Sequence, residues 1–222
     1  MKIKLIVSAL IVGLLGAGYA QAEVAVTGDL GSTGLGAHIS VPIQPNLNAR
    51  FGLNYLNYSY SSSTTDVDYD YKLKLNTFDA LLDYFPTDGG FRVSTGIVYN
   101  GNKIDVVGKP TATGTYTLNG NTYTAANAGT INGNIDFRKV APYLGIGWGN
   151  ANKEKGWGFS GDLGVLFQGS PNTTLTNSGC IATAALCSQL ASDVAVEQVK
   201  LADDVSSFKA YPVLRVGISH RF

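Results

Sequence analysis

The sequence predicts an all-β protein: an eight-stranded antiparallel transmembrane β-barrel with a helix in its last long loop. The first observation behind this prediction is that residues 211–222 alternate between an apolar face and a small or charged face. The apolar face holds Pro212, Leu214, Val216, Ile218, His220 and Phe222, and the other face holds Val213, Arg215, Gly217, Ser219 and Arg221. A barrel strand that faces lipid outside and a polar lumen inside has this alternation.

The second observation is an export signal at the N-terminus. Lys2 and Lys4 precede an apolar run over residues 5–15, and Ala20-Gln21-Ala22 is a small-x-small cleavage site. These features predict a cleaved signal peptide over 1–22, with an uncleaved anchoring helix as the alternative. A spanning helix needs about 20 apolar residues, and no other segment of the chain reaches that length without charges. We therefore expect residues 23–222 to cross the membrane as a closed barrel, in which every backbone group is paired.

Composition and charge agree with an exported β protein. The chain has 27 Gly, 12 Tyr and 9 Phe, and only 14% of its residues are charged. Loss of Lys2 and Lys4 with the signal leaves 14 of the 16 basic residues against 16 acidic ones. This nearly even balance does not favour nucleic acid or a strongly acidic ligand as a partner.

Eight segments show the alternation of a half-buried strand. They are residues 23–30, 35–43, 49–60, 68–85, 91–106, 134–148, 156–169 and 211–222. In the third segment the apolar phase shifts after Tyr55, which predicts a β-bulge. The first two segments are separated by a predicted tight turn at Gly31–Gly34. One long strand over 23–43 is the alternative, and it would leave an odd total of seven strands.

The connections between these strands alternate in length. The short ones are 44–48, 86–90 and 149–155, and the long ones are 61–67, about 107–133 and about 170–210. Outer membrane barrels keep short turns in the periplasm, so both mature termini are expected there. Aromatic residues form two predicted interfacial bands. The band beside the short turns holds Tyr84, Phe85, Phe91, Trp148, Trp157 and Phe222, and the band toward the long loops holds Tyr58, Tyr60, Tyr69, Tyr71, Tyr99 and Tyr211.

These features together resemble the small OmpA-like and OmpW-like outer membrane β-barrels. The resemblance covers 23–222 and rests on the signal peptide, the strand pattern and the terminal Gly217-Ile-Ser-His-Arg-Phe222. It implies the outer membrane of a Gram-negative type of envelope, with the lipid bilayer and the barrel-assembly machinery as partners. Tyr211, Ile218 and Phe222 are the candidate assembly signal in the last strand. OmpW-like proteins are thought to offer a narrow, hydrophobic path for small molecules, and no motif here confirms one.

The inward faces of the predicted strands form a polar lumen. Its charged members are Arg50, Asp79, Asp83, Arg92, Asp162, Arg215 and Arg221, and its uncharged members include His38, Ser40, Asn54, Ser94, Asn100, Ser160, Gln168 and Ser219. An eight-stranded barrel is filled by its own side chains or holds one small ligand. We expect a structural network that closes the lumen, with a narrow gated pore or ligand site as the alternative. Inward glycines make room for arginine side chains or leave a water-filled void. We also expect Asp83 and Arg92 to pair across the 86–90 turn.

A catalytic role and a cofactor are not expected. His38 and Ser40 share a face, a spacing similar to that of barrel lipid A deacylases. Nucleophilic serine needs a base that is itself oriented by an acid, and the sequence places no acid convincingly beside this pair. The pair also points into the lumen, whereas lipid approaches from outside. Two His and two Cys form no metal-binding pattern.

The long loops hold the remaining signals. Cys180 and Cys187, the only cysteines of an exported chain, predict a disulfide within the last loop. Residues 188–208 have helical periodicity, with Asp193 off the apolar stripe. The stripe holds Leu190, Val194, Leu201, Val205 and Phe208. This helix could cap the mouth, cover the rim or present a binding face, and a lumen plug is the alternative. A hairpin over 115–121, extending the fifth and sixth strands and turning at Asn119-Gly120, is also predicted.

The expected function is that of a structural barrel or a passive small-solute channel. A surface adhesin or receptor that binds through the external loops is the alternative, and a lipid-modifying enzyme is the least favoured interpretation. The sequence names neither a solute nor a surface ligand.

Overall fold

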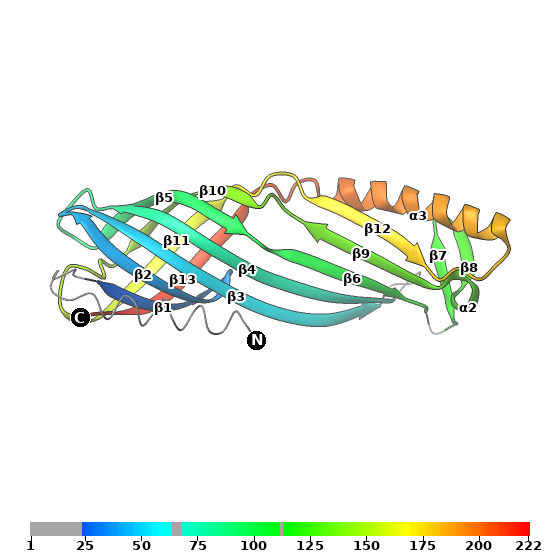
Figure 1. The fold of residues 1–222 in the computed structure, drawn as a ribbon, viewed down its shortest axis with the longest axis horizontal. Coiled ribbons are helices and arrows are strands. Elements are labelled where there is room, and N and C mark those ends of the chain that lie inside the picture. Colours follow the sequence, from blue (N-terminus) through cyan, green and yellow to red (C-terminus); the bar gives the residue numbers. More distant parts are fainter. Residues whose placement is uncertain (1–23, 64–67, 112) are drawn as a thin grey trace, which may run out of the picture.

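The computed structural model describes residues 24–63, 68–111 and 113–222. The predicted signal peptide and most of the predicted loop 61–67 lie outside these ranges. Eight strands form a closed antiparallel ring, as predicted (Figure 1). In ring order they are β1 (Ala25–Gly31), β2 (Gly34–Gln44), β3 (Leu47–Ser63), β4 (Asp68–Tyr84), β5 (Phe91–Asn100), β10 (Val140–Trp148), β11 (Gly156–Leu166) and β13 (Tyr211–Arg221), which pairs back with β1. The first two strands form a hairpin, and the alternative of one strand over 23–43 is wrong.

The outer surface of the ring is apolar. On β13, Leu214, Val216 and Ile218 are exposed by 58%, 63% and 50%, whereas the intervening Val213 and Arg215 are buried. Every other barrel strand also presents large exposed apolar residues, among them Leu35 on β2 and Leu144 on β10. A soluble monomer rarely exposes so large an apolar surface, so this belt is suited to contact with lipid.

The three short turns and the C-terminus lie at the same end of the barrel, called here the turn end (Figure 1). Trp148, Trp157 and Phe222 are strongly exposed there, and the ring of His220 contacts both Trp157 and Phe222 edge-on. These residues match one predicted aromatic band. Phe85 does not belong to it, because its side chain is buried.

Beyond the other end, the sheet continues as an open projection, called here the extension (Figure 1). β3 and β4 run past the rim, and β4 then pairs with β6 (Lys103–Lys109), which leads to β9 (Thr130–Asp136) and β12 (Asn172–Ser178). The predicted strands 91–106 and 134–148 are therefore each split at the rim, into β5 and β6 and into β9 and β10. β12 was not predicted. At each split, β5 or β10 remains in the closed ring, whereas β6 or β9 continues the sheet beyond the rim, where β6 pairs with β4 and β9 pairs with β6.

The predicted bulge after Tyr55 is wrong. β3 pairs with β4 without a register shift, from Leu47 opposite Tyr84 to Ser63 opposite Asp68. The irregularity lies instead between Pro42 and Gln44, where β2 meets β3. The apolar phase changes along β3 because the environment of each face changes at the rim. In the barrel the apolar side chains of β3 lie on the outward face, whereas in the extension they lie on the face continuous with the lumen, where Tyr60 stacks on Tyr71 of β4.

The tyrosines of the second predicted aromatic band show this change of environment. Tyr60 and Tyr71 are opposite each other in the β3–β4 register and stack with ring centroids 4.9 Å apart, on the face continuous with the lumen. Tyr58 and Tyr69 flank them on the same face. These four residues therefore line the extension rather than an outward band. Tyr99 does lie on the outward face of the barrel.

A helix and a small hairpin complete the extension. α3 (Ala184–Val205) lies along β12, and its first half packs on β7 (Thr115–Leu118), β8 (Asn121–Thr124) and the short α2 (Ala125–Ala128) (Figure 1). The predicted hairpin turns at Asn119 and Gly120, both with positive φ, but it forms a separate sheet and does not extend the barrel strands. α3 starts and ends earlier than the predicted 188–208 and lies outside the barrel, so it does not plug the lumen. Within the described ranges, no helix is both long and apolar enough to cross a membrane.

Candidate functional site

The turn-end half of the lumen holds a four-residue ion-pair network, called here the lower network. Arg50 on β3 contacts Asp83 through Nε and Asp162 through Nη1, at 2.9 Å each. Arg92 on β5 donates from Nη2 to Asp162 at 2.8 Å and from Nη1 to the carbonyl of Gly149. All four charged side chains are at most 7% exposed. The expected Asp83–Arg92 contact is the longest of the set at 3.8 Å, and the closer partner of Asp83 is Arg50.

A second network surrounds His38 on β2. Its ring nitrogens face two carboxylates, Nδ1 at 2.6 Å from Asp29 and Nε2 at 3.2 Å from Asp79. Arg215 on β13 pairs with Asp79 at 3.0 Å, and Asn54 donates to the same carboxylate. Asp29 was missing from the predicted lumen residues. Its alternation with the outward Val26 and Leu30 was a signal that could have placed it inward.

Glycines set the positions of the bulky lumen side chains. Gly52 is opposite His38 in the β2–β3 register, and a Cβ at this glycine would collide with the imidazole ring. A Cβ at Gly164 would likewise collide with the phenol of Tyr143. The expected room for an arginine occurs at Gly147, beside Arg92. The inward glycines therefore accommodate a histidine and a tyrosine as well as an arginine.

Apolar side chains fill the part of the lumen nearer the extension. They are Leu81, Val98, Ala141, Tyr143, Leu166 and Val213. Beside the lower network a space of only about 20 Å³ remains, which holds about one water molecule. The charges inside the barrel also balance. They are four arginines (Arg50, Arg92, Arg215 and Arg221) and four aspartates (Asp29, Asp79, Asp83 and Asp162), besides His38.

The remaining predicted lumen residues are distributed along the barrel. Arg221 donates to the carbonyls of Asn152 and Lys153 and so holds the last short turn against the turn end. Near the extension, the side-chain amide of Gln168 donates to the carbonyl of Phe208. Ser40 and Ser219 are buried, and Ser160 is half-buried. Among the described residues, no cluster of three His, Cys, Asp or Glu could hold a metal ion.

The three residues of the candidate assembly signal do not share a face. Ile218 and Phe222 point outward and are exposed, in keeping with a recognisable outer surface on the last strand. Tyr211 lies on the inward side, and its hydroxyl donates to the carbonyl of Ser32 at 2.5 Å. This bond ties the first hairpin to the start of β13.

Asp193 joins α3 to the β7–β8 hairpin. It was predicted to lie off the packed stripe, yet it is 2% exposed. Its carboxylate accepts hydrogen bonds from the Tyr123 hydroxyl at 2.5 Å and from the side-chain amides of Asn121 and Asn119 at 2.8 and 3.1 Å. These bonds, the one from Tyr123 above all, lower the pKa of Asp193 to about 2. Burial, together with the carboxylate, raises the pKa of Tyr123 to about 12.

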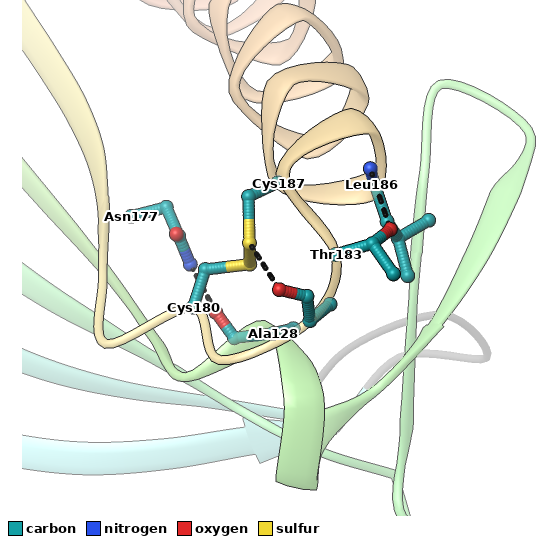
Figure 2. The surroundings of a disulfide bond; sticks show 7 residues. Ala128, Asn177, Cys180, Thr183, Leu186 and Cys187 are labelled. Atoms are coloured by element: carbon teal, nitrogen blue, oxygen red, sulfur yellow. Dashed lines mark hydrogen bonds between the residues drawn. A yellow bond between two sulfur atoms is a disulfide. The ribbon is translucent and has the colours of Figure 1, made fainter.

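The predicted disulfide lies at the N-terminal end of this helix (Figure 2). Cys180 and Cys187 are bonded across the first helical turn. The side chain of Thr183 accepts a hydrogen bond from the backbone N–H of Leu186, which caps the helix. On the neighbouring strand, Asn177 donates to the carbonyl of Ala128 at 2.6 Å. The disulfide therefore ties the start of α3 to the segment that follows β12, and the Asn177 bond ties β12 to α2.

Two cavities lie between the sheet of the extension and α3. One has a volume of about 240 Å³, sits directly beyond the barrel mouth and is almost wholly apolar. The other is an open groove of about 750 Å³, lined by tyrosines of β4 and by charged residues of α3. The two share Ile135 of β9 in their walls.

Comparison with known proteins relates this architecture to solved barrels. No family model matches the chain, and neither does any curated protein. The structure of Acinetobacter baumannii CarO is similar, with 26% identity and a TM-score of 0.57 over 90% of this chain and 98% of that one. CarO2 of the same organism shows 22% identity and a TM-score of 0.56 over 91% and 100% of the two chains. A major outer membrane protein of Thermus thermophilus is a more distant match, with 16% identity and a TM-score of 0.43. In its fold, the chain is an outer membrane β-barrel protein.

Proposed function

We propose that this chain is an integral outer membrane barrel with a sealed lumen, whose role is to anchor the extension at the cell surface. The observation that carries this proposal is the filled lumen. The lower network, the network around His38 and an apolar cluster leave about 20 Å³ beside the lower network. A hydrated solute needs far more room than one water molecule occupies.

The membrane setting of the proposal rests on the surface of the barrel. The outward face carries a continuous apolar belt, and exposed tryptophans mark the turn end. Short turns and the C-terminus share that end, which favours a periplasmic position for both mature termini and an external position for the extension. Insertion by the barrel-assembly machinery through the last strand, and a closer relationship to OmpA-like or OmpW-like proteins, remain predictions.

Two other functions receive less support. A passive channel would need a path through the lower network, where Arg50, Asp83, Arg92 and Asp162 occupy the turn-end half of the lumen. A lipid-modifying activity would need His38 as a base for Ser40. The structure does place acids beside His38, contrary to the expectation from the sequence, but both ring nitrogens face carboxylates and neither is left to accept a proton from Ser40. This geometry supports a barrel without catalytic function.

Surface binding is the second candidate function, because the extension is an ordered platform rather than a set of loops. A disulfide, the Asp193 contacts and a buried apolar cluster hold α3 and the hairpin together. A rigid surface loses little conformational entropy on binding. Cells that display the full chain should then bind a host surface or a glycan array more strongly than cells whose residues 110–130 are replaced by a Gly-Ser linker.

Conductance of the refolded mature chain in planar bilayers tests the sealed barrel. We expect correctly inserted protein to show no discrete channels, and deletion of α3 to leave the bilayer equally silent because the helix lies outside the lumen. Arg92→Ala serves as a variant that loosens the network. Discrete channels from the unmodified chain, altered by Arg92→Ala, would overturn the proposal in favour of a gated pore.

A further inference from the structure

The apolar cavity of about 240 Å³ lies where the barrel meets the extension. Its sheet wall is formed by Leu73 and Leu75 of β4, Ile104 of β6 and Ile135 of β9. The opposite wall is formed by Val205 at the end of α3 and by Phe208 beyond it. The sheet residues lie on the face continuous with the lumen. The cavity is therefore a vestibule directly beyond the barrel mouth.

The polar groups around this vestibule already have protein partners. The Asn102 side chain accepts a hydrogen bond from the backbone N–H of Asn76, and the Gln168 amide donates to the carbonyl of Phe208. Lys103, the one charged residue in the wall, lies 3.8 Å from Asp105. An occupant would therefore be recognised by apolar contact and not by hydrogen bonds.

The size of the vestibule defines the occupant further. Protein interiors are close-packed and leave few voids larger than a water molecule. Water gains too few partners in an apolar cavity to fill it, and a cavity of roughly 150 Å³ is enough to bind benzene. We propose that the vestibule is a binding site for an unbranched alkyl chain of a single-chain amphiphile or of a membrane lipid.

The open groove accounts for the polar head of such a molecule. It lies beside the vestibule, with Ile135 in the walls of both, and is lined by Glu197, Lys200 and Asp204 of α3. A chain seated in the vestibule can leave its polar end in this groove, in contact with water. In the opposite direction the buried Leu166 and Tyr143 close the lumen. The site therefore retains its ligand and does not pass it through the barrel, which takes it beyond the proposed anchoring function.

The cavity also reaches the surface. Phe208 lines it and is nevertheless 58% exposed. The side-chain amide of Gln168 donates to the backbone carbonyl of Phe208 and so holds this residue at the barrel rim. Because the side chain both lines the vestibule and is exposed, it lies at the entrance of the vestibule. A substitution at this position can report on the vestibule without removing the sheet wall.

A fluorescent reporter tests the site in the full mature chain. Phe208→Trp is made in a background of Trp148→Phe and Trp157→Phe, so that the indole at the vestibule is the sole tryptophan. The protein is placed in nanodiscs of saturated phospholipid and titrated with 10-bromodecan-1-ol, whose bromine quenches indole fluorescence on contact. We expect saturable quenching, because a defined cavity holds a limited number of chains.

Cavity-filling variants separate the site from simple partition into lipid. Ile104→Phe shortens the vestibule, and Ile97→Phe makes the same change on the outward face of the barrel as a control. Each methylene buried adds roughly a factor of four to affinity, so exclusion of two should weaken binding about 15-fold in Ile104→Phe and leave the control unchanged. Leu73→Phe repeats the test if the first variant does not fold.

The source of the chain is distinguished by a second nanodisc. This nanodisc contains phospholipid with brominated acyl chains and no added alcohol. If a membrane lipid is the occupant, the fluorescence of the Phe208→Trp reporter should be quenched more strongly than that of the same reporter carrying Ile104→Phe. Quenching only by the added alcohol identifies a free amphiphile. Quenching that never saturates, and that is equal in the filled and control variants, would overturn the proposal without affecting the sealed-barrel function.

Discussion

Replacement of Arg50 by methionine should lower the free energy of unfolding by about 3–5 kcal/mol, the usual consequence of removing one partner of a buried ion pair. Arg50 is the hub of the lower network, with Asp83 and Asp162 each 2.9 Å from its guanidinium. Without it, the only cation left to Asp83 is Arg92 at 3.8 Å, beside the hydrogen bond from the Ser94 hydroxyl, and Asp162 must share the same cation at 2.8 Å. One buried negative charge is then left without compensation, in a barrel interior that admits about one water molecule.

The loss is measured by urea unfolding in lipid vesicles, followed by the fluorescence of Trp148 and Trp157. Both indoles lie on the outer surface of the barrel and pass from lipid to water when it unfolds. Arg138→Met is the matched control, because it makes the same change at an exposed position beside the rim. It should shift the free energy of unfolding by less than about 0.5 kcal/mol.

A second substitution tests the reasoning rather than the size of the effect. Arg50→Met combined with Asp83→Asn removes the uncompensated charge and leaves Arg92 paired with Asp162. The double variant should therefore recover more than half of the stability lost by Arg50→Met alone. A loss by Arg50→Met no larger than that of Arg138→Met, or a double variant less stable than the single one, would refute the network as the source of stability.

Three further results are expected. Arg92→Ala should lower the unfolding midpoint less than Arg50→Met, because Asp83 and Asp162 both keep Arg50 as a partner, but more than the outward Thr95→Ala. The same urea titration in vesicles measures all three midpoints, and equal midpoints for Arg92→Ala and Thr95→Ala would contradict a stabilising Arg92 contact. The low pKa of Asp193 means that its bonds stabilise the folded extension above about pH 4 and that this contribution is lost as the pH falls toward 2. NMR signals of the hairpin side-chain amides should therefore shift in that window, and Asp193→Ala should show the acid-state signals at every pH. Replacing both cysteines by serine should reduce local stability at the start of α3 by up to about 2.5 kcal/mol, the loop entropy for a bridge seven residues apart; hydrogen exchange should rise in the first turns of the helix while the unfolding midpoint of the barrel stays unchanged.

Local patterns made the barrel predictable. The alternation on β13 separates Leu214, Val216 and Ile218 from Val213 and Arg215, and the structure places the first set outside and the second inside. Since the side-chain period of a strand is two, one apolar face fixes the direction of every side chain on that strand. The same argument assigned the charged lumen residues to the interior, and it would have included Asp29 had it been applied to β1.

The same reasoning could not predict which charged lumen residues form ion pairs with each other. Asp83 and Arg92 are close in sequence across a short turn, and that closeness suggested their pairing. In the structure Arg50 reaches Asp83 from the neighbouring strand and Asp162 across the ring, and Arg92 reaches Asp162 past Gly147 of β10. The choice depends on strand stagger and on which side chains are long enough to cross the lumen, and no sequence pattern records either quantity.

The extension shows most clearly which features the alternation of residues does not predict. The predicted strands 91–106 and 134–148 ran across a rim that no residue marks, because β6 and β9 keep the alternation of β5 and β10. Both β5 and β6 pair with β4, whereas β9 pairs with β6 and β12 where β10 pairs with β5 and β11. Asp193 carries no apolar signal, and it is buried only because the hairpin brings Asn119, Asn121 and Tyr123 to it.

Sequence patterns were enough to predict the number of barrel strands, the direction of most of their side chains, a helix in the last loop and the pairing of the two cysteines, because each depends on a short repeat or on a few neighbouring residues. The tertiary structure decided the ion-pair partners, the filling of the lumen, the departure of the sheet into the extension and the apolar vestibule beneath α3. These features depend on distances between residues that are remote in the chain, and only the closed ring and its register set those distances.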